Sequence, residues 1–129
     1  MVLSVGVNDL PRRSNEEIIK NYRQILAAVP PAVPVIFSAV LPFDEETSAE
    51  FLGRNRRVQE LNRAAKQLCA SFKNCQFLDS GGKLIDRAGN LAHEYHVGDG
   101  VHLNAKGYSL WISELNRELR SAYCNAGAR

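Results

Sequence analysis

The most restrictive feature of this sequence is a short apolar run held between two prolines. Residues 35–41 read VIFSAVL, with Pro34 before them and Pro42 after them. Proline lacks a backbone N–H and is confined to strand ends and edges, so the two prolines limit one strand. A strand that is apolar on both faces is typical of a parallel sheet covered by helices. The run therefore predicts a buried strand in an α/β fold.

Three amphipathic helices are predicted around this strand in the chain. Ser14 and Glu17 form a capping-box pattern, and the apolar residues that follow recur at helical spacing until a pair of prolines. Residues 55–72 carry a second apolar stripe, and a third helix starts after Asn104, a favourable N-cap. We expect the third helix to bury five side chains at a period of 3.6: Tyr108, Trp111, Ile112, Leu115 and Leu119.

Two further apolar runs complete an alternating order of elements. Residues 1–6 and 76–78 indicate short strands that run into polar loops. Strand, helix, strand, helix, strand, helix describes consecutive right-handed βαβ units, and 129 residues suit a single domain spanning 1–129. Ligands of such sheets bind beyond the carboxyl ends of the strands. Functional residues are therefore expected in the loops that begin at Asn8, Pro42 and Asp79, and in the loop before the last helix.

Charge and hydropathy argue against several classes of partner. The formal net charge is +2, with Lys and Arg interspersed among Asp and Glu, so neither nucleic acid nor an anionic membrane is indicated. Without a run of about 18 apolar residues, no membrane span is predicted. No targeting signal is recognised, and we expect a soluble chain. A basic cluster is interpreted as the solvated face of the second helix rather than a phosphate-binding patch: Arg54, Arg56, Arg57, Arg63 and Lys66.

Three cysteines bear on the redox state of the chain. Cys69 and Cys75 could be bridged between a helix end and the next strand, whereas Cys124 lies near the terminus. An odd number of cysteines without metal-type spacing favours free thiols, which suggests a reducing compartment.

The segment before the last helix holds an acid and a base three positions apart. His102 lies in a Gly-rich loop where an imidazole can stay exposed and titrate near neutral pH. Asp99 can accept the Nδ1 proton, fix the tautomer and stabilise an imidazolium during proton transfer. Asn8 follows Gly6 at the end of the first strand, where its amide can donate a hydrogen bond into the same crevice. These residues together indicate an acyl-transfer site.

Two short blocks carry a family resemblance. GVND, from Gly6 to Asp9, and DGVH, from Asp99 to His102, resemble blocks of the SGNH or GDSL serine esterases and lipases. The resemblance implies a flavodoxin-like three-layer α/β/α hydrolase with about three strands in this chain. It also implies that Asn8 is an oxyanion donor, His102 the general base and Asp99 its orienting acid, acting on a small acyl ester without cofactor or metal.

The family's Gly-Asp-Ser nucleophile motif has no counterpart in this sequence. A strand, helix and strand to carry it would need about 30 residues before Gly6, so the chain resembles the C-terminal portion of an SGNH domain, truncated and inactive alone. Ser80 follows a strand but lacks the preceding glycine, and is interpreted as part of a polar turn. Ser4 and Ser38 are expected to be buried in their strands.

Two other functions are considered. Without a neighbour, the apolar first strand would be an exposed sheet edge, so we expect pairing with a second copy into a sheet of about six strands. A noncatalytic dimeric binding or structural module is therefore the alternative function. Metal binding is a less favoured possibility, with five candidate ligands: His93, Glu94, His96, Asp99 and His102. Their spacing matches no zinc pattern, and a polar loop accounts for His93 and His96.

Overall fold

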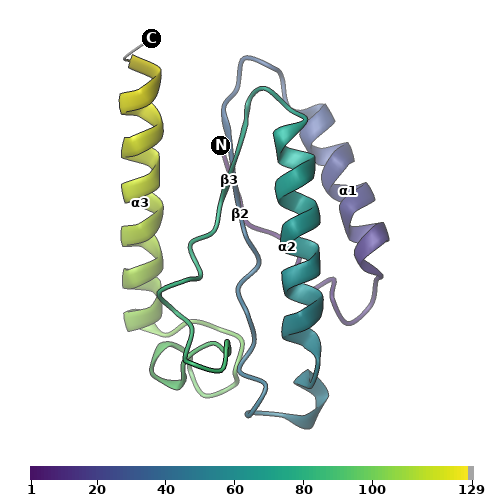
Figure 1. Cartoon of the computed structure of the whole chain (residues 1–129), viewed down its shortest axis with the longest axis vertical. Coiled ribbons are helices and arrows are strands. Elements are labelled where there is room, and N and C mark those ends of the chain that lie inside the picture. Colours follow the sequence, from purple (N-terminus) through teal and green to yellow (C-terminus); the bar gives the residue numbers. More distant parts are fainter. Residues whose placement is uncertain (128–129) are drawn as a thin grey trace.

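The computed structural model describes residues 1–127 and has the alternating order expected from the sequence (Figure 1). The strands are β1 (Val2–Leu3), β2 (Val35–Ser38) and β3 (Cys75–Leu78), and all pair in parallel in the order β1-β2-β3. The helices are α1 (Asn15–Ala28), α2 (Arg54–Ala70) and α3 (Ala105–Gly127), with short 3-10 turns η1 (Ala49–Phe51) and η2 (His93–Tyr95).

The helices lie on both sides of the sheet, which confirms the predicted three-layer α/β arrangement. Figure 1 shows α1 and α2 on one side of the strands and α3 on the other. The main core joins α1 and α2 to β2, and Tyr22 meets Phe37 edge-on at a centroid distance of 4.8 Å. The capping box of α1 is confirmed, because Ser14 accepts from the Glu17 N–H and Glu17 accepts from the Ser14 N–H.

Two strands are shorter than predicted, and beyond the end of β2 a side chain of α2 replaces the sheet ladder. β1 ends well before Gly6, whose φ of +119° turns the chain out of the extended conformation. β2 ends at Ser38, and beyond it the backbone of Val40 is held by Asn62 of α2. The Val40 N–H donates to Oδ1 of Asn62, and Nδ2 of Asn62 donates to the Val40 carbonyl, both at 2.8 Å.

The predicted burial of α3 was wrong for two residues. Tyr108 and Ile112 are 49% and 47% exposed, while Trp111, Leu115 and Leu119 are half-buried. The apolar stripe of α3 does not pack on the sheet along its whole length. The first turn of α3 packs against η2 instead. There Gly107 passes so close to the Tyr95 carbonyl that a Cβ would overlap it. The apolar face of α3 is therefore partly open to solvent.

The prediction of free thiols was also wrong for two of the three cysteines. Cys69, in the last turn of α2, is disulfide-bonded to Cys75 at the start of β3, because the intervening turn brings their Cα atoms within 5.3 Å. Cys124 is a free, exposed thiol.

None of the helices within residues 1–127 is both long enough and apolar enough to cross a membrane, as the sequence predicted.

Candidate active site

Asp99 and His102 form a directly bonded pair in the loop before α3. Oδ2 of Asp99 lies 2.5 Å from Nδ1 of His102, and Oδ1 of Asp99 accepts the N–H groups of Val101 and His102 at 2.9 Å each. The His102 side chain is 70% exposed. Because Asp99 occupies Nδ1, the Nε2 atom is the nitrogen free to exchange a proton with a bound molecule.

The same hydrogen bonds keep Asp99 ionised. Desolvation acts to raise the pKa of Asp99, but it is outweighed by hydrogen bonds from the His102 imidazole and from the N–H groups of His102 and Val101. The pKa of Asp99 is therefore lowered to about 2. An anionic Asp99 at neutral pH suits a group that orients an imidazole and stabilises its protonated form.

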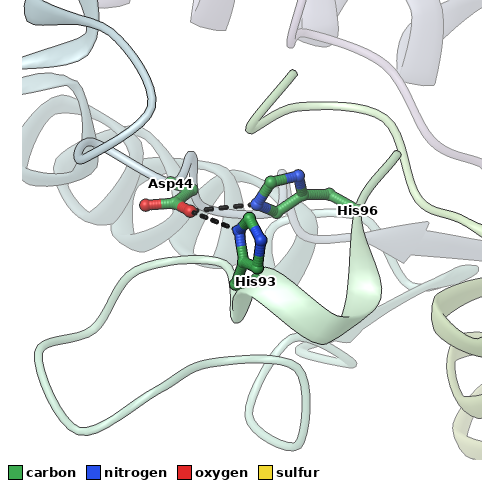
Figure 2. A group of neighbouring side chains, drawn as sticks. All are labelled: Asp44, His93 and His96. Atoms are coloured by element: carbon green, nitrogen blue, oxygen red, sulfur yellow. Dashed lines mark hydrogen bonds and ion pairs between the residues drawn. The ribbon is translucent and has the colours of Figure 1, made fainter. Parts of the chain in front are cut away.

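Asp44 and His96 form a second aspartate–histidine pair (Figure 2). This pair holds the loop that carries Asp99. Nε2 of His96 lies 2.9 Å from Oδ2 of Asp44, and the His96 side chain is wholly buried. Nδ1 of His96 accepts the N–H groups of Gly98 and Gly100 at 3.0 and 3.2 Å, one on each side of Asp99. The Asp44 N–H in turn donates to the Gly100 carbonyl at 2.8 Å. This pair fixes the backbone on both sides of the Asp99 carboxylate.

The hydrogen bonds of His96 also determine its tautomer, which decides whether Asp44, His93 and His96 suit a metal ion. Asp44, His93 and His96 have donor atoms within 4.8 Å of one another. Because Nδ1 of His96 accepts two N–H groups, the ring proton lies on Nε2 and is donated to Asp44. A metal at Nε2 would need the proton moved to Nδ1, against both backbone donors. The donor set therefore fits a hydrogen-bonded clamp rather than a metal centre.

The five donors considered from the sequence as metal ligands do not form one group. Asp99 and His102 bond to each other, and Glu94 pairs with Lys106 at 2.6 Å. His93 is exposed, as expected for a histidine of a polar loop. His96 is buried, and its interpretation as a polar-loop residue was therefore wrong.

The block from Gly6 to Asp9 forms a turn at the carboxyl end of β1. The Asp9 N–H donates to the Gly6 carbonyl at 3.1 Å, and the Asp9 carboxylate pairs with Arg13 at 3.5 Å. Gly6 is buried beneath Tyr22, whose hydroxyl donates to the Val5 carbonyl at 2.9 Å. Asn8 is exposed on this turn.

Two adjoining hollows bring Asn8 and His102 to one region. A pocket of about 190 Å³ lies between the ends of β1 and β2 and the start of α3, and His102, Tyr108 and Trp111 are among its lining residues. Asn8 lines a neighbouring groove of about 440 Å³. Val7, Phe43 and Val101 belong to the walls of both. The structure thus places Asn8 and His102 on two adjoining hollows that share three wall residues.

The candidate serines occupy three different environments. Ser38 is buried, as expected, but Ser4 is exposed and lines the same pocket as His102, so the prediction that Ser4 is buried was wrong. β1 stops at Leu3, which leaves Ser4 outside the ladder. Ser80 is buried after β3, and its hydroxyl has no hydrogen-bond partner among residues 1–127.

The sequence interpretation missed two asparagines of α2 that shape the crevice. Asn55 accepts the Phe43 N–H at 2.7 Å and donates to the Phe43 carbonyl at 2.8 Å, while Asn62 makes the equivalent pair of bonds to Val40. Both stabilise the segment that lines the pocket and the groove. Their spacing of seven, two turns of one helix face, was the available signal.

The fold of this chain is similar to that of several solved structures. A protein from Streptococcus pneumonia that carries the name of platelet activating factor aligns with a TM-score of 0.83 and 28% identity, over 92% of this chain and 58% of its own. A GDSL-like lipase from Bacteroides thetaiotaomicron aligns with a TM-score of 0.79 and 20% identity, over 94% of this chain and 62% of its own. At 20% identity the second likeness shows the fold alone. The chain thus spans about three fifths of these proteins.

A family model extends the match to the sequence. No curated protein matches the chain, whereas the model of the GDSL-like lipase/acylhydrolase family matches residues 1–110 and so includes both the turn at Asn8 and the Asp99–His102 pair. The family that the motifs indicated is therefore confirmed: this chain belongs to the GDSL-like lipase/acylhydrolase family.

Proposed function

We propose that this chain is an acylhydrolase domain in which His102 is the general base, Asp99 its orienting acid and Asn8 an oxyanion donor. The observation that carries the proposal is the 2.5 Å Asp99–His102 pair, whose exposed imidazole lines an apolar pocket next to the Asn8 groove. His102 takes the proton of a serine hydroxyl as that oxygen attacks the ester carbonyl, and passes the proton to the leaving alcohol. It then takes a proton from water, which attacks the acyl-serine, and returns that proton to the serine oxygen as the acid leaves. Asn8 donates to the oxyanion in both steps. The pocket volume of about 190 Å³ favours a short acyl group, and no cofactor takes part.

We further propose that the serine nucleophile does not come from residues 1–129. No Gly-Asp-Ser motif occurs in the sequence. Ser38 and Ser80 are buried, and Ser4 is preceded by Val2 and Leu3 rather than by the Gly-Asp of the family motif. The base then lacks the serine hydroxyl of the family motif, and the chain alone is inactive.

Ester hydrolysis and serine labelling test both proposals. We expect the chain alone to hydrolyse p-nitrophenyl acetate no faster than its His102→Ala variant, and to remain unlabelled by a fluorophosphonate. Fused to a family segment that carries the Gly-Asp-Ser strand and the following helix and strand, it is expected to turn over. His102→Ala should then lower the rate by about 10⁴-fold or more.

Two results would contradict these proposals. Labelling of the chain alone, abolished by Ser4→Ala, would place the nucleophile at Ser4. Equal turnover of the fused protein with and without His102 would remove the general-base role.

We also propose that β1 pairs with β1 of a second copy. Within the described residues β1 pairs with β2 alone. Val2 in β1 and Val5, two residues after it, are 43% and 39% exposed. No charged side chain occurs in residues 1–8 to oppose strand addition. A two-fold pairing closes the edge and is the feature that favours the alternative function, a dimeric module.

Light scattering measures this assembly directly. We expect twice the chain mass of 14.3 kDa, and a shift to the single mass in Val2→Lys, because a lysine on the edge blocks strand addition. A single-chain mass for the unmodified protein would refute the pairing.

A further inference from the structure

The groove beside Asn8 is lined by two arginines and by no acidic side chain. Its walls are Val7, Asn8, Pro11, Arg12, Phe43, Phe51, Arg54 and Val101. Three of these residues also line the pocket of His102: Val7, Phe43 and Val101. The groove therefore continues from the proposed reaction centre, and the charge on its walls is positive.

Arg54 is held in this groove by aromatic contacts rather than by an ion pair. Its guanidinium carbon lies 5.3 Å from the ring centroid of Phe43 and 5.1 Å from that of Phe51. Stacking on ring faces restrains the guanidinium plane and leaves its N–H groups available for a planar anion. Among the residues that the structure describes, neither Arg12 nor Arg54 forms an ion pair with a carboxylate, and Asp9 is engaged by Arg13.

The other basic residues of α2 have different surroundings. Arg56 is 85% exposed and faces Glu60 at 3.4 Å. Arg57 donates to the carbonyls of Leu10 and Arg13 and so fastens the loop before α1. The sequence interpretation of this cluster as one solvated helix face therefore does not hold for Arg54 and Arg57.

We propose that the Arg12–Arg54 groove binds the anionic group, a carboxylate or a phosphate, of an acyl ester whose ester bond lies between Asn8 and His102. The proposal rests on the proposed function and names the substrate class that this site takes. Two guanidinium groups supply charge-assisted hydrogen bonds to the anion, and a planar fork can bind two of its oxygens at once. The shared walls place an anion bound here next to the proposed oxyanion donor.

Binding of small anions, measured without turnover, tests the groove. We expect monobutyl phosphate and hexanoate to shift the Asn8 amide and Arg54 side-chain NMR signals saturably, whereas neutral butanol does not. Arg12→Gln and Arg54→Gln should each weaken binding about tenfold, the loss expected for one charge-assisted hydrogen bond. Added salt should weaken it further. Tighter binding of the phosphate or of the carboxylate then identifies which anion the groove prefers.

Arg56→Gln is the matched control, because it removes the same charge from an exposed position of the same helix. Unchanged anion binding in Arg56→Gln supports the groove. A loss of binding as large as in Arg12→Gln and Arg54→Gln would show that only the overall positive charge matters, and would overturn the proposal. Absence of saturable binding would overturn it as well. Because Arg54 packs on two rings, the thermal unfolding of Arg54→Gln is measured first. If Arg54→Gln does not fold, the binding measured with Arg12→Gln decides the test.

The outcome is separable from that of the acylhydrolase proposal. His102→Ala should leave anion binding unchanged, because the anion does not contact the imidazole. Anion binding by a fused protein that hydrolyses no ester would count against the acylhydrolase role alone. Turnover of a neutral ester without anion binding would count against the groove alone.

Discussion

Gly6→Ala is expected to lower the free energy of unfolding by about 3 kcal/mol, measured by urea denaturation. Gly6 has a φ of +119°, where an L side chain is strained, and a Cβ there would overlap the Tyr22 hydroxyl. Tyr22 is buried and donates to the Val5 carbonyl, so it cannot move aside without losing that bond. The substitution therefore strains the turn that carries Asn8.

Gly53→Ala separates backbone strain from steric overlap. Gly53 also has a positive φ, +79°, but nothing lies within 4 Å of the position its Cβ would take. We expect it to cost about 1 kcal/mol, the strain alone. A loss as large as that of Gly6→Ala would show that overlap with Tyr22 is unimportant.

The double variant Gly6→Ala/Tyr22→Phe tests the overlap itself. Tyr22→Phe alone removes one hydrogen bond and should cost about 1 kcal/mol. In the double variant the closest atom is gone, and the next neighbours of the added Cβ are Val40 Cγ2 at 3.1 Å and Tyr22 Cζ at 3.3 Å. We therefore expect the double variant to lose less stability than the sum of the losses of Gly6→Ala and Tyr22→Phe, by about 1 kcal/mol or more. Additive losses would contradict the assigned contact.

The order of elements and the acid–base pair could be predicted because both are local in sequence. The proline-bounded run 35–41 and the apolar stripes of the helices identify their elements by periodicity alone. Asp99 and His102 are three residues apart, so a single turn suffices to join them. The family match, which covers residues 1–110, agrees with these local signals.

The groups that support the acid–base pair could not be predicted because their partners are distant in sequence. Asp44 and His96 are 52 residues apart, and Asn55 of α2 bonds to Phe43 in the segment after β2, 12 residues away. No periodicity marks a buried histidine that bonds to an aspartate from another loop. The exposed face of α3 was misjudged for a related reason, since periodicity shows that a face is apolar but not what covers it.

His96→Leu is expected to lower the free energy of unfolding by about 3 kcal/mol at neutral pH. It removes the donor to a buried carboxylate and the acceptor of the Gly98 and Gly100 N–H groups. His93→Leu is the matched control, because His93 is exposed and lies 3.9 Å from the same carboxylate, and it should cost well under 1 kcal/mol. Equal losses in the two variants would refute the clamp.

The clamp should also be visible in the pH dependence of stability. Burial acts to raise the pKa of Asp44, but hydrogen bonds from His96, the Glu46 N–H and Thr47 outweigh it and lower the pKa. A carboxyl whose folded pKa lies below its unfolded value of about 3.9 stabilises the fold above that pH. This contribution is lost as the pH falls through the folded pKa. Asp44→Asn should therefore flatten the acid limb of the stability curve, and an unchanged limb would exclude Asp44 as its source.

A positioning role for His96 predicts an effect on Asp99, which His96 does not touch. Its two backbone bonds fix Gly98 and Gly100 on either side of Asp99. In His96→Leu the loop loosens, the hydrogen bonds that hold the pKa of Asp99 near 2 weaken, and that pKa should rise towards its ordinary value. Carboxyl NMR titration of folded His96→Leu and His93→Leu measures this shift. A pKa of Asp99 near 2 in both variants would leave His96 a stabilising residue without a positioning role in the site.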